Sequence, residues 1–136
     1  MAYLWNTERL NKDLARIDGA IMAGRYNLAM KLAHRSLRQY YSSFLKSNEV
    51  EVEQMKADNV RQMGVYISKY LLKYFRKYNV PYSERRIIFI SLVSNFIFIA
   101  TMNLTESDEH LTDKATATYA RENVYNIISY LMHYFG

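Results

Sequence analysis

Turn-forming residues are rare in this chain, which has four glycines and one proline among 136 residues. Glycine and proline are the strongest breakers of regular structure, so their scarcity favours a small number of long elements. Between them, apolar residues recur at steps of three and four, the period of one face of an α-helix. The sequence therefore predicts an all-α fold, a compact bundle of five to six helices. Its length predicts one helical domain over residues 1–136.

Local signals mark where the predicted helices begin and end. The first helix is expected after a cap at Asn6 or Thr7 and should stop at Gly24. Three further helices are predicted from apolar periodicity at residues 27–46, 60–78 and 112–135. Pro81 separates the third helix from the next, because proline cannot continue a helix and restricts the residue before it.

The most apolar segment of the chain runs from Ile87 to Met102, 16 residues that include a few polar side chains. A transmembrane helix needs about 20 predominantly apolar residues, so no membrane partner is expected. A β-hairpin turning at Ser94 and Asn95 is an alternative, but tight hairpins favour a glycine that neither position supplies. We predict that this segment is the buried central helix of the bundle, with Ser83 as its N-cap.

The chain contains no cysteine, which excludes disulfide bonds and thiolate chemistry. The N-terminal residues lack a basic stretch followed by an apolar one, so no signal peptide is expected. Together these features predict a cytoplasmic location.

Positive charge is concentrated in one part of the sequence. Residues 61–86 hold seven basic residues and one acidic residue, within a chain of formal net charge +5. Such segregation raises the expectation of a polyanionic partner. The predicted phosphate contacts are Arg61, Lys69, Lys73, Arg76 and Lys77, and the predicted base-stacking residues are Tyr70 and Tyr74. Alternatively, the tyrosines flank the core with hydrated hydroxyls while the lysines lie beside them. A weaker basic patch is expected at Lys31, Arg35 and Arg38.

A polar loop at residues 103–110 follows the apolar segment and ends at His110. Glu106, Asp108, Glu109 and His110 carry potential metal ligands. No second histidine stands at helical spacing from His110, so a solvated acidic loop is expected, with no metal and no cofactor.

Several short motifs are shared with one known family. His110 follows a predicted helix break and precedes a predicted helix that carries Tyr-Ala-Arg-Glu-Asn-Val at 119–124. The turn Ala-Gly-Arg-Tyr-Asn at 23–27 leads into a segment rich in leucine and alanine, and Asn103 lies in the polar loop. Together these motifs resemble the C-terminal domain of abortive-infection proteins, a family related to the HEPN ribonucleases and toxins. The resemblance implies a HEPN-like helical bundle, a two-fold homodimer and a role in prokaryotic anti-phage defence.

Active HEPN members cut RNA without a metal, using an arginine directly before the asparagine and a histidine a few residues later. Asn103 and His110 match that pattern, but Met102 occupies the arginine position and cannot hold a phosphate. The resemblance therefore implies a catalytically weak or inactive regulatory module that binds RNA or a protein partner. One alternative is an active metal-independent endoribonuclease that uses Asn103, His110 and Arg121. Another is a helical protein-interaction adaptor with no nucleic-acid role.

Overall fold

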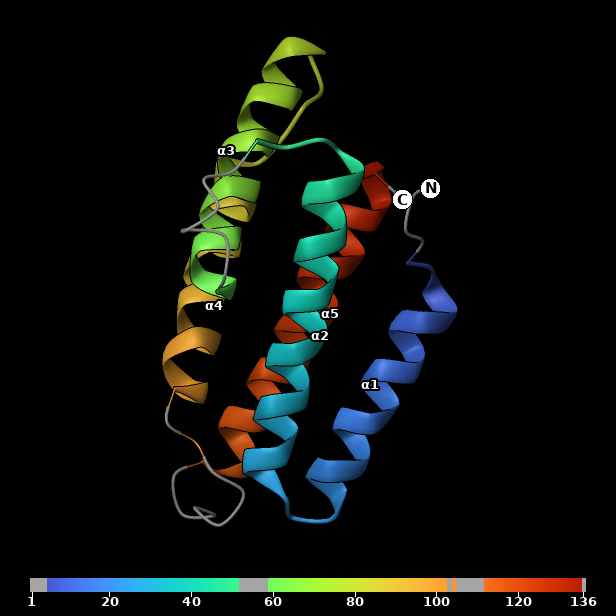
Figure 1. The fold of residues 1–136 in the computed structure, drawn as a ribbon, viewed down its shortest axis with the longest axis vertical. Coiled ribbons are helices and arrows are strands. Elements are labelled where there is room, and N and C mark those ends of the chain that lie inside the picture. Colours follow the sequence, from blue (N-terminus) through green and yellow to red (C-terminus); the bar gives the residue numbers. More distant parts are fainter. Residues whose placement is uncertain (1–4, 52–58, 103, 105–111, 136) are drawn as a thin grey trace.

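A computed structural model describes residues 5–51, 59–102, 104 and 112–135, and its described part contains five helices and no strand (Figure 1). The all-α prediction is confirmed. The helices are α1 (Thr7–Met22), α2 (Tyr26–Ser47), α3 (Val60–Lys77), α4 (Glu84–Thr101) and α5 (Lys114–Phe135).

Side-chain caps explain where four of these helices begin. Asn6 accepts a hydrogen bond from the backbone N–H of Arg9 at 2.8 Å, and Asn59 caps α3 in the same way at 2.9 Å. Ser83 caps α4 as predicted, and Asp113 accepts from the N–H of Thr116 ahead of α5. These acceptors satisfy N–H groups that have no partner within the helix.

Gly24 ends the first helical region, as the sequence predicts. Its φ of +73° lies in the left-handed region that glycine adopts without steric strain. The N–H of the next residue, Arg25, then donates to the carbonyl of Ala20 at 2.9 Å, which closes the end of α1. The chain can therefore reverse into α2 after a very short turn.

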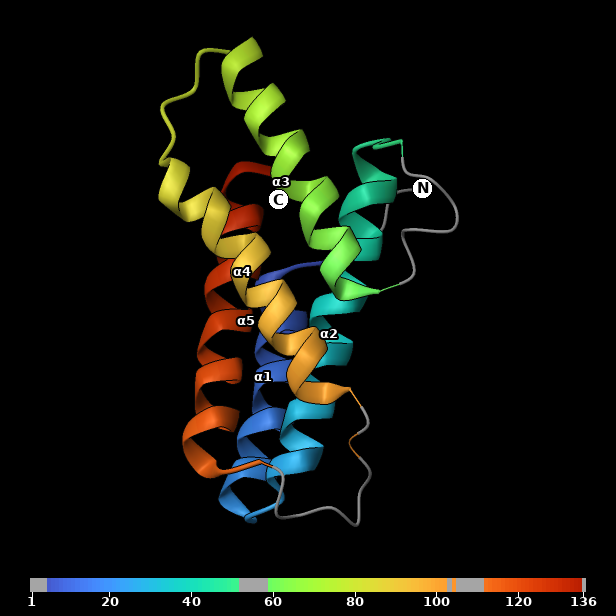
Figure 2. The same cartoon turned by 90° about the vertical axis from the view of Figure 1, so that its left-hand side faces the viewer.

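The centre of the bundle is α2, which packs against each of the other four helices (Figure 1). The prediction that residues 87–102 form the central helix is wrong, although the segment is helical. In Figure 2, α4 lies on the outside of the bundle, packed closely on α3 and only sparsely on α5. High hydropathy reports how much apolar surface a helix carries, whereas the central position depends on having partners on every side. Small residues such as Ala29, Ala33 and Ser36 let neighbouring helices approach α2 closely.

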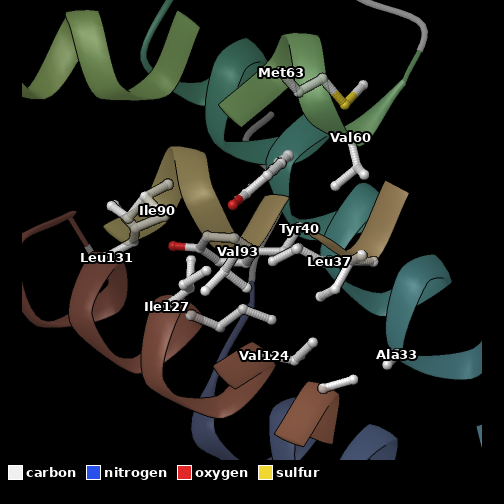
Figure 3. Packing of buried hydrophobic residues seen from close by; sticks show 14 of the residues in the cluster. Ala33, Leu37, Tyr40, Val60, Met63, Ile90, Val93, Val124, Ile127 and Leu131 are labelled. Carbon is white, nitrogen blue, oxygen red and sulfur yellow. The ribbon is translucent and has the colours of Figure 1, made fainter. Parts of the chain in front are cut away.

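The core consists of apolar side chains from all five helices, and Figure 3 shows part of it. Leu37 and Tyr40 from α2 meet Val93 from α4 and Ile127 from α5 in this region. Each of these side chains is at least 95% buried. Burial of apolar area is the main favourable contribution to folding, so this cluster accounts for most of the stability of the bundle.

A seam of small and hydroxyl-bearing residues joins α3 to α4 beneath Tyr41 of α2. The Tyr41 hydroxyl lies 2.6 Å from Ser94 Oγ, which itself donates to the carbonyl of Ile90. Tyr41 is therefore the donor in the first bond. Nearby, Ser68 Oγ donates to the carbonyl of Gly64 at 2.9 Å. Every polar side chain in this seam is satisfied, as buried groups need to be.

Burial of Tyr41 predicts a specific loss of stability in alkaline solution. Desolvation raises the pKa of its fully buried phenol above the ordinary value of 10.0. The unfolded chain releases this proton first, so the free energy of unfolding should fall as the pH rises above 10. The expected contribution is about 1.4 kcal/mol per pH unit for this one proton.

Chemical denaturation of wild type and Tyr41→Phe between about pH 9 and pH 11 would measure this effect. The variant should be about 1 kcal/mol less stable near neutral pH, because it lacks the hydroxyl that binds Ser94. Its stability should then decline less steeply above pH 10. Parallel alkaline curves for the two proteins would contradict the assignment to Tyr41.

Candidate nucleic-acid interface

The outer face of α3 carries a basic ridge, which we define as Lys69, Lys73, Arg76 and Lys77. All four side chains are exposed. The opposite face of the same helix buries residues such as Ile67, Leu71 and Phe75. Steps of three and four residues place side chains on one face of a helix, so the cations line up along the side that points away from the core.

The basic ridge extends onto the free end of the α3–α4 hairpin. In Figures 1 and 2, the end of α3 and the start of α4 project beyond the neighbouring ends of α2 and α5. Arg85 and Arg86 are exposed at the start of α4, and Glu84 is the only acidic residue between positions 69 and 86. This tip therefore presents a concentrated positive charge to solvent.

Among the described residues, no carboxylate forms an ion pair with Lys69 or Lys73. Other cations of the region have contacts that orient them. Arg76 Nε donates to the Tyr82 hydroxyl at 3.3 Å, and Lys77 Nζ lies 5.3 Å from the ring centroid of Tyr78. The two lysines are thus the ridge positions with the greatest freedom to meet an anion.

Arg61 does not belong to the basic ridge. It lies in the first turn of α3, and its guanidinium carbon is 4.8 Å from the ring centroid of Phe98 on α4. This contact is a cation–π interaction across the α3–α4 surface. The structure therefore brings together four of the five predicted phosphate contacts and separates Arg61 from them.

Tyr70 and Tyr74 lie in an aromatic cluster between α3 and the end of α5. The ring of Tyr70 is 5.8 Å from Phe44 and 5.9 Å from Phe135, and that of Tyr74 is 4.8 Å from Phe135. Both tyrosines are half-buried, and desolvation raises the pKa of Tyr70, with smaller contributions from Tyr74 and Tyr78. This arrangement matches the alternative interpretation, in which the tyrosines flank the core.

Tyr78 is the tyrosine of this run with the most accessible ring, at 56% exposure. It follows the last residue of α3 and lies beside Lys77, where a stacked base could contact both. The four-residue spacing of tyrosines is visible in the sequence. The ring of Tyr78 contacts this aromatic cluster through Tyr74, 4.7 Å away, but the projection of the α3 end beyond α2 leaves Tyr78 more exposed than Tyr70 and Tyr74 (Figure 1).

The second predicted basic patch lies on another side of the bundle. Arg35 from α2 and Arg16 from α1 line an open groove of about 250 Å³ that also contains Asp13. Ser36 Oγ donates to the Asp13 carboxylate at 2.7 Å, which fixes a negative charge in the groove. That carboxylate makes this surface a weaker anion site than the basic ridge.

Arg121 is engaged by carboxylates. Its Nε and Nη2 donate to the two oxygens of Asp18 at 2.9 and 3.2 Å, and its Nη1 donates to Glu122 at 2.9 Å. The hydrogen bond to Asp18 is the main reason that the pKa of Arg121 is raised. Bidentate pairing uses the face of the guanidinium that a phosphate would need.

The other predicted catalytic residues, Asn103 and His110, lie outside the described residues, as do Glu106, Asp108 and Glu109. The arrangement of Asn103 and His110 relative to Arg121 therefore stays a prediction. Met102, at the end of α4, is 49% exposed.

Within the described ranges, no three histidine, aspartate or glutamate side chains gather where they could hold a metal ion. None of the helices in those ranges combines the length and hydropathy that a membrane span requires. Comparisons of the chain with family models, with curated proteins and with solved structures gave no match.

Proposed function

We propose that the protein is an RNA-binding regulatory module that holds the phosphate backbone with the basic ridge of α3. The observation that carries this function is the pair Lys69 and Lys73, exposed on one helix face and free of carboxylates among the described residues. One helical turn separates them, about 6 Å along the axis. A row of cations at this spacing suits a strand of regularly placed phosphates.

The contacts around the ridge favour single-stranded RNA over a featureless polyanion. Tyr78 presents an exposed ring next to Lys77, and aromatic rings of this kind stack on unpaired bases. Because every base has a flat face, such stacking tolerates many sequences. We therefore expect binding with strong salt dependence and modest sequence preference.

Two residues at the positions relevant to HEPN catalysis support binding of RNA without cleavage. Met102 replaces the arginine of the active HEPN pattern, and Arg121 is already paired with Asp18 and Glu122. The resemblance to abortive-infection domains supplies the proposed setting, prokaryotic anti-phage defence, and the proposed assembly, a homodimer.

Charge reversal on the ridge provides the test. Fluorescence anisotropy with a short labelled single-stranded RNA would compare wild type, Lys69→Glu/Lys73→Glu and the control Lys12→Glu/Lys114→Glu. All four lysines are exposed, and each double variant changes the net charge equally. Each lost phosphate contact should reduce the slope of log affinity against log salt by about 0.7. The ridge variant should therefore lose about 1.4 in slope, and the control should bind like wild type.

The same samples test cleavage. RNA incubated with wild type in EDTA should stay intact, as it should with His110→Ala. Chelator-resistant cleavage that His110→Ala abolishes would instead support the ribonuclease. Equal affinities for the ridge and control variants would remove the electrostatic basis of RNA binding and favour a protein-interaction adaptor.

A further inference from the structure

Helix α4 carries apolar residues all around its circumference, but the other described helices cover it on one side only. Its inner face, including Ile87, Ile90 and Ile97, is buried in the core. Its outer face exposes a second row of large apolar side chains: Ile88 (56%), Leu92 (63%), Ile99 (54%) and Met102 (49%). Figure 2 shows α4 crossing the front of the molecule with no described helix over it. A helix that is apolar on every side is normally buried on every side.

The outer row follows a coiled-coil repeat. Positions 88, 92, 95, 99 and 102 are separated by four, three, four and three residues, the spacing of the a and d positions of a heptad. Asn95 fills the middle position. We call these five residues the α4 outer stripe. Over its length of about 21 Å, the stripe has the form of a seam that packs against another helix.

We infer that the α4 outer stripe is the surface on which a second copy of this chain docks, with the two α4 helices related by a two-fold axis. Asn95 lies seven residues from Ile88 and seven from Met102, at the centre of the stripe. A two-fold axis through the middle of a stripe brings each central residue close to its own copy. The asparagine amide both donates and accepts hydrogen bonds, so it can pair with itself among apolar neighbours.

Charge also favours a second copy over the other possible partners. No charged residue occurs between positions 87 and 105, and the positions flanking the stripe include Phe89, Phe96 and Phe98. Arg61 of α3 lies over the Phe98 ring, to one side of the stripe. Two copies that each carry a net charge of +5 can therefore meet along the stripe itself through apolar residues. A lipid headgroup or a nucleic acid would find no cation within the stripe.

Aromatic residues beside the stripe widen the apolar surface. Phe96 packs edge-on against Tyr119 of α5 at 5.1 Å, and Tyr119 is itself 48% exposed. The surface thus continues from α4 onto α5. A stable interface needs about 800 Å² from each partner, more than a single row of side chains supplies.

This inference specifies the interface of the proposed homodimer and depends on that part of the proposed function, not on RNA binding. The full chain would be examined by sedimentation velocity over a range of micromolar concentrations. Wild type should reach twice the chain mass of 16.1 kDa, and Leu92→Glu should sediment as one chain. Met22→Asp is the matched control, because Met22 is an 88% exposed apolar residue at the end of α1. It should remain dimeric.

Cross-linking gives a second measurement that does not depend on breaking the interface. The natural chain has no cysteine, so Asn95→Cys introduces a single thiol near the proposed axis. Mild oxidation should join two Asn95→Cys chains through a disulfide and should leave Lys12→Cys unjoined. A monomeric wild type, a dimeric Leu92→Glu or equal cross-linking of both cysteine variants would overturn the inference. So would binding of wild type, but not Leu92→Glu, to uncharged lipid vesicles.

The outcomes also separate this interface from RNA binding. Lys69→Glu/Lys73→Glu should lose RNA affinity and stay dimeric, because both lysines lie on α3, outside the stripe. Leu92→Glu should become monomeric and keep a salt-dependent affinity for RNA.

Discussion

Replacing Gly64 with valine should lower the free energy of unfolding by about 3 kcal/mol, because a side chain at this position overpacks the α3–α4 seam. A Cβ atom built at Gly64 would lie 2.7 Å from Ser94 Cβ and still closer to Ser94 Oγ. Ser94 is fully buried and holds hydrogen bonds to both Tyr41 and Ile90, so it has little room to move. Urea denaturation followed by far-UV circular dichroism would measure the loss.

A substitution at Gly19 is the control, because it should raise the free energy of unfolding where the Gly64 substitution lowers it. Gly19 lies within α1, is exposed, and a Cβ there would meet no atom within 4 Å. Gly19→Ala should therefore stabilise the protein by about 0.5–1 kcal/mol, since alanine is the better helix former and restricts the unfolded chain. Comparable effects of a Gly64 substitution and Gly19→Ala would show that α3 and α4 do not approach closely at this point.

A double-mutant cycle can assign the Gly64 effect to its neighbour. Ser94→Gly removes the two atoms that a Cβ at position 64 would approach within 3 Å, although it leaves the buried Tyr41 hydroxyl without its acceptor. Gly64→Ala combined with Ser94→Gly should therefore be less destabilised than the sum of the two single changes. Strict additivity would place the strain elsewhere.

Truncating Phe75 to alanine should destabilise the protein by about 4 kcal/mol. The side chain is completely buried, and its ring lies 5.6 Å from Tyr82 and 5.0 Å from Tyr134. It therefore joins α3 to the α3–α4 connection and to the end of α5. Removing it leaves a cavity and also loses the aromatic contacts that support the projecting hairpin. The midpoint of thermal unfolding and the urea midpoint should both fall.

Tyr78→Ala is the matched aromatic control. Tyr78 is 56% exposed and lies 4.7 Å from the ring of Tyr74, so its removal opens no cavity in the core. Its effect on stability should stay below about 1 kcal/mol. If Tyr78 stacks on bases, the same variant should weaken RNA binding while it remains folded. A Phe75→Ala protein as stable as Tyr78→Ala would contradict the packing at this end of the bundle.

Much of the local structure follows from short stretches of sequence. The caps at Asn6 and Ser83 and the stop at Gly24 act over three or four residues, so their effects are visible without tertiary information. The helical character of residues 87–102 is likewise local. The basic ridge could be predicted for the same reason, because helical periodicity alone places Lys69 and Lys73 on one face.

The sequence alone did not reveal features that depend on which helices become neighbours. Arg121 and Asp18 are 103 positions apart and pair only because α1 and α5 pack side by side. Arg61 leaves the basic ridge because Phe98 on α4 offers its guanidinium a ring.

The helical periods and end signals of this chain set its five helices, because those signals act within a few residues. The order in which the helices pack was set by tertiary contacts, which put α2 at the centre and α4 at the edge. Hydropathy measures the apolar surface that needs covering, and the surrounding helices determine how much of that surface is covered within one chain.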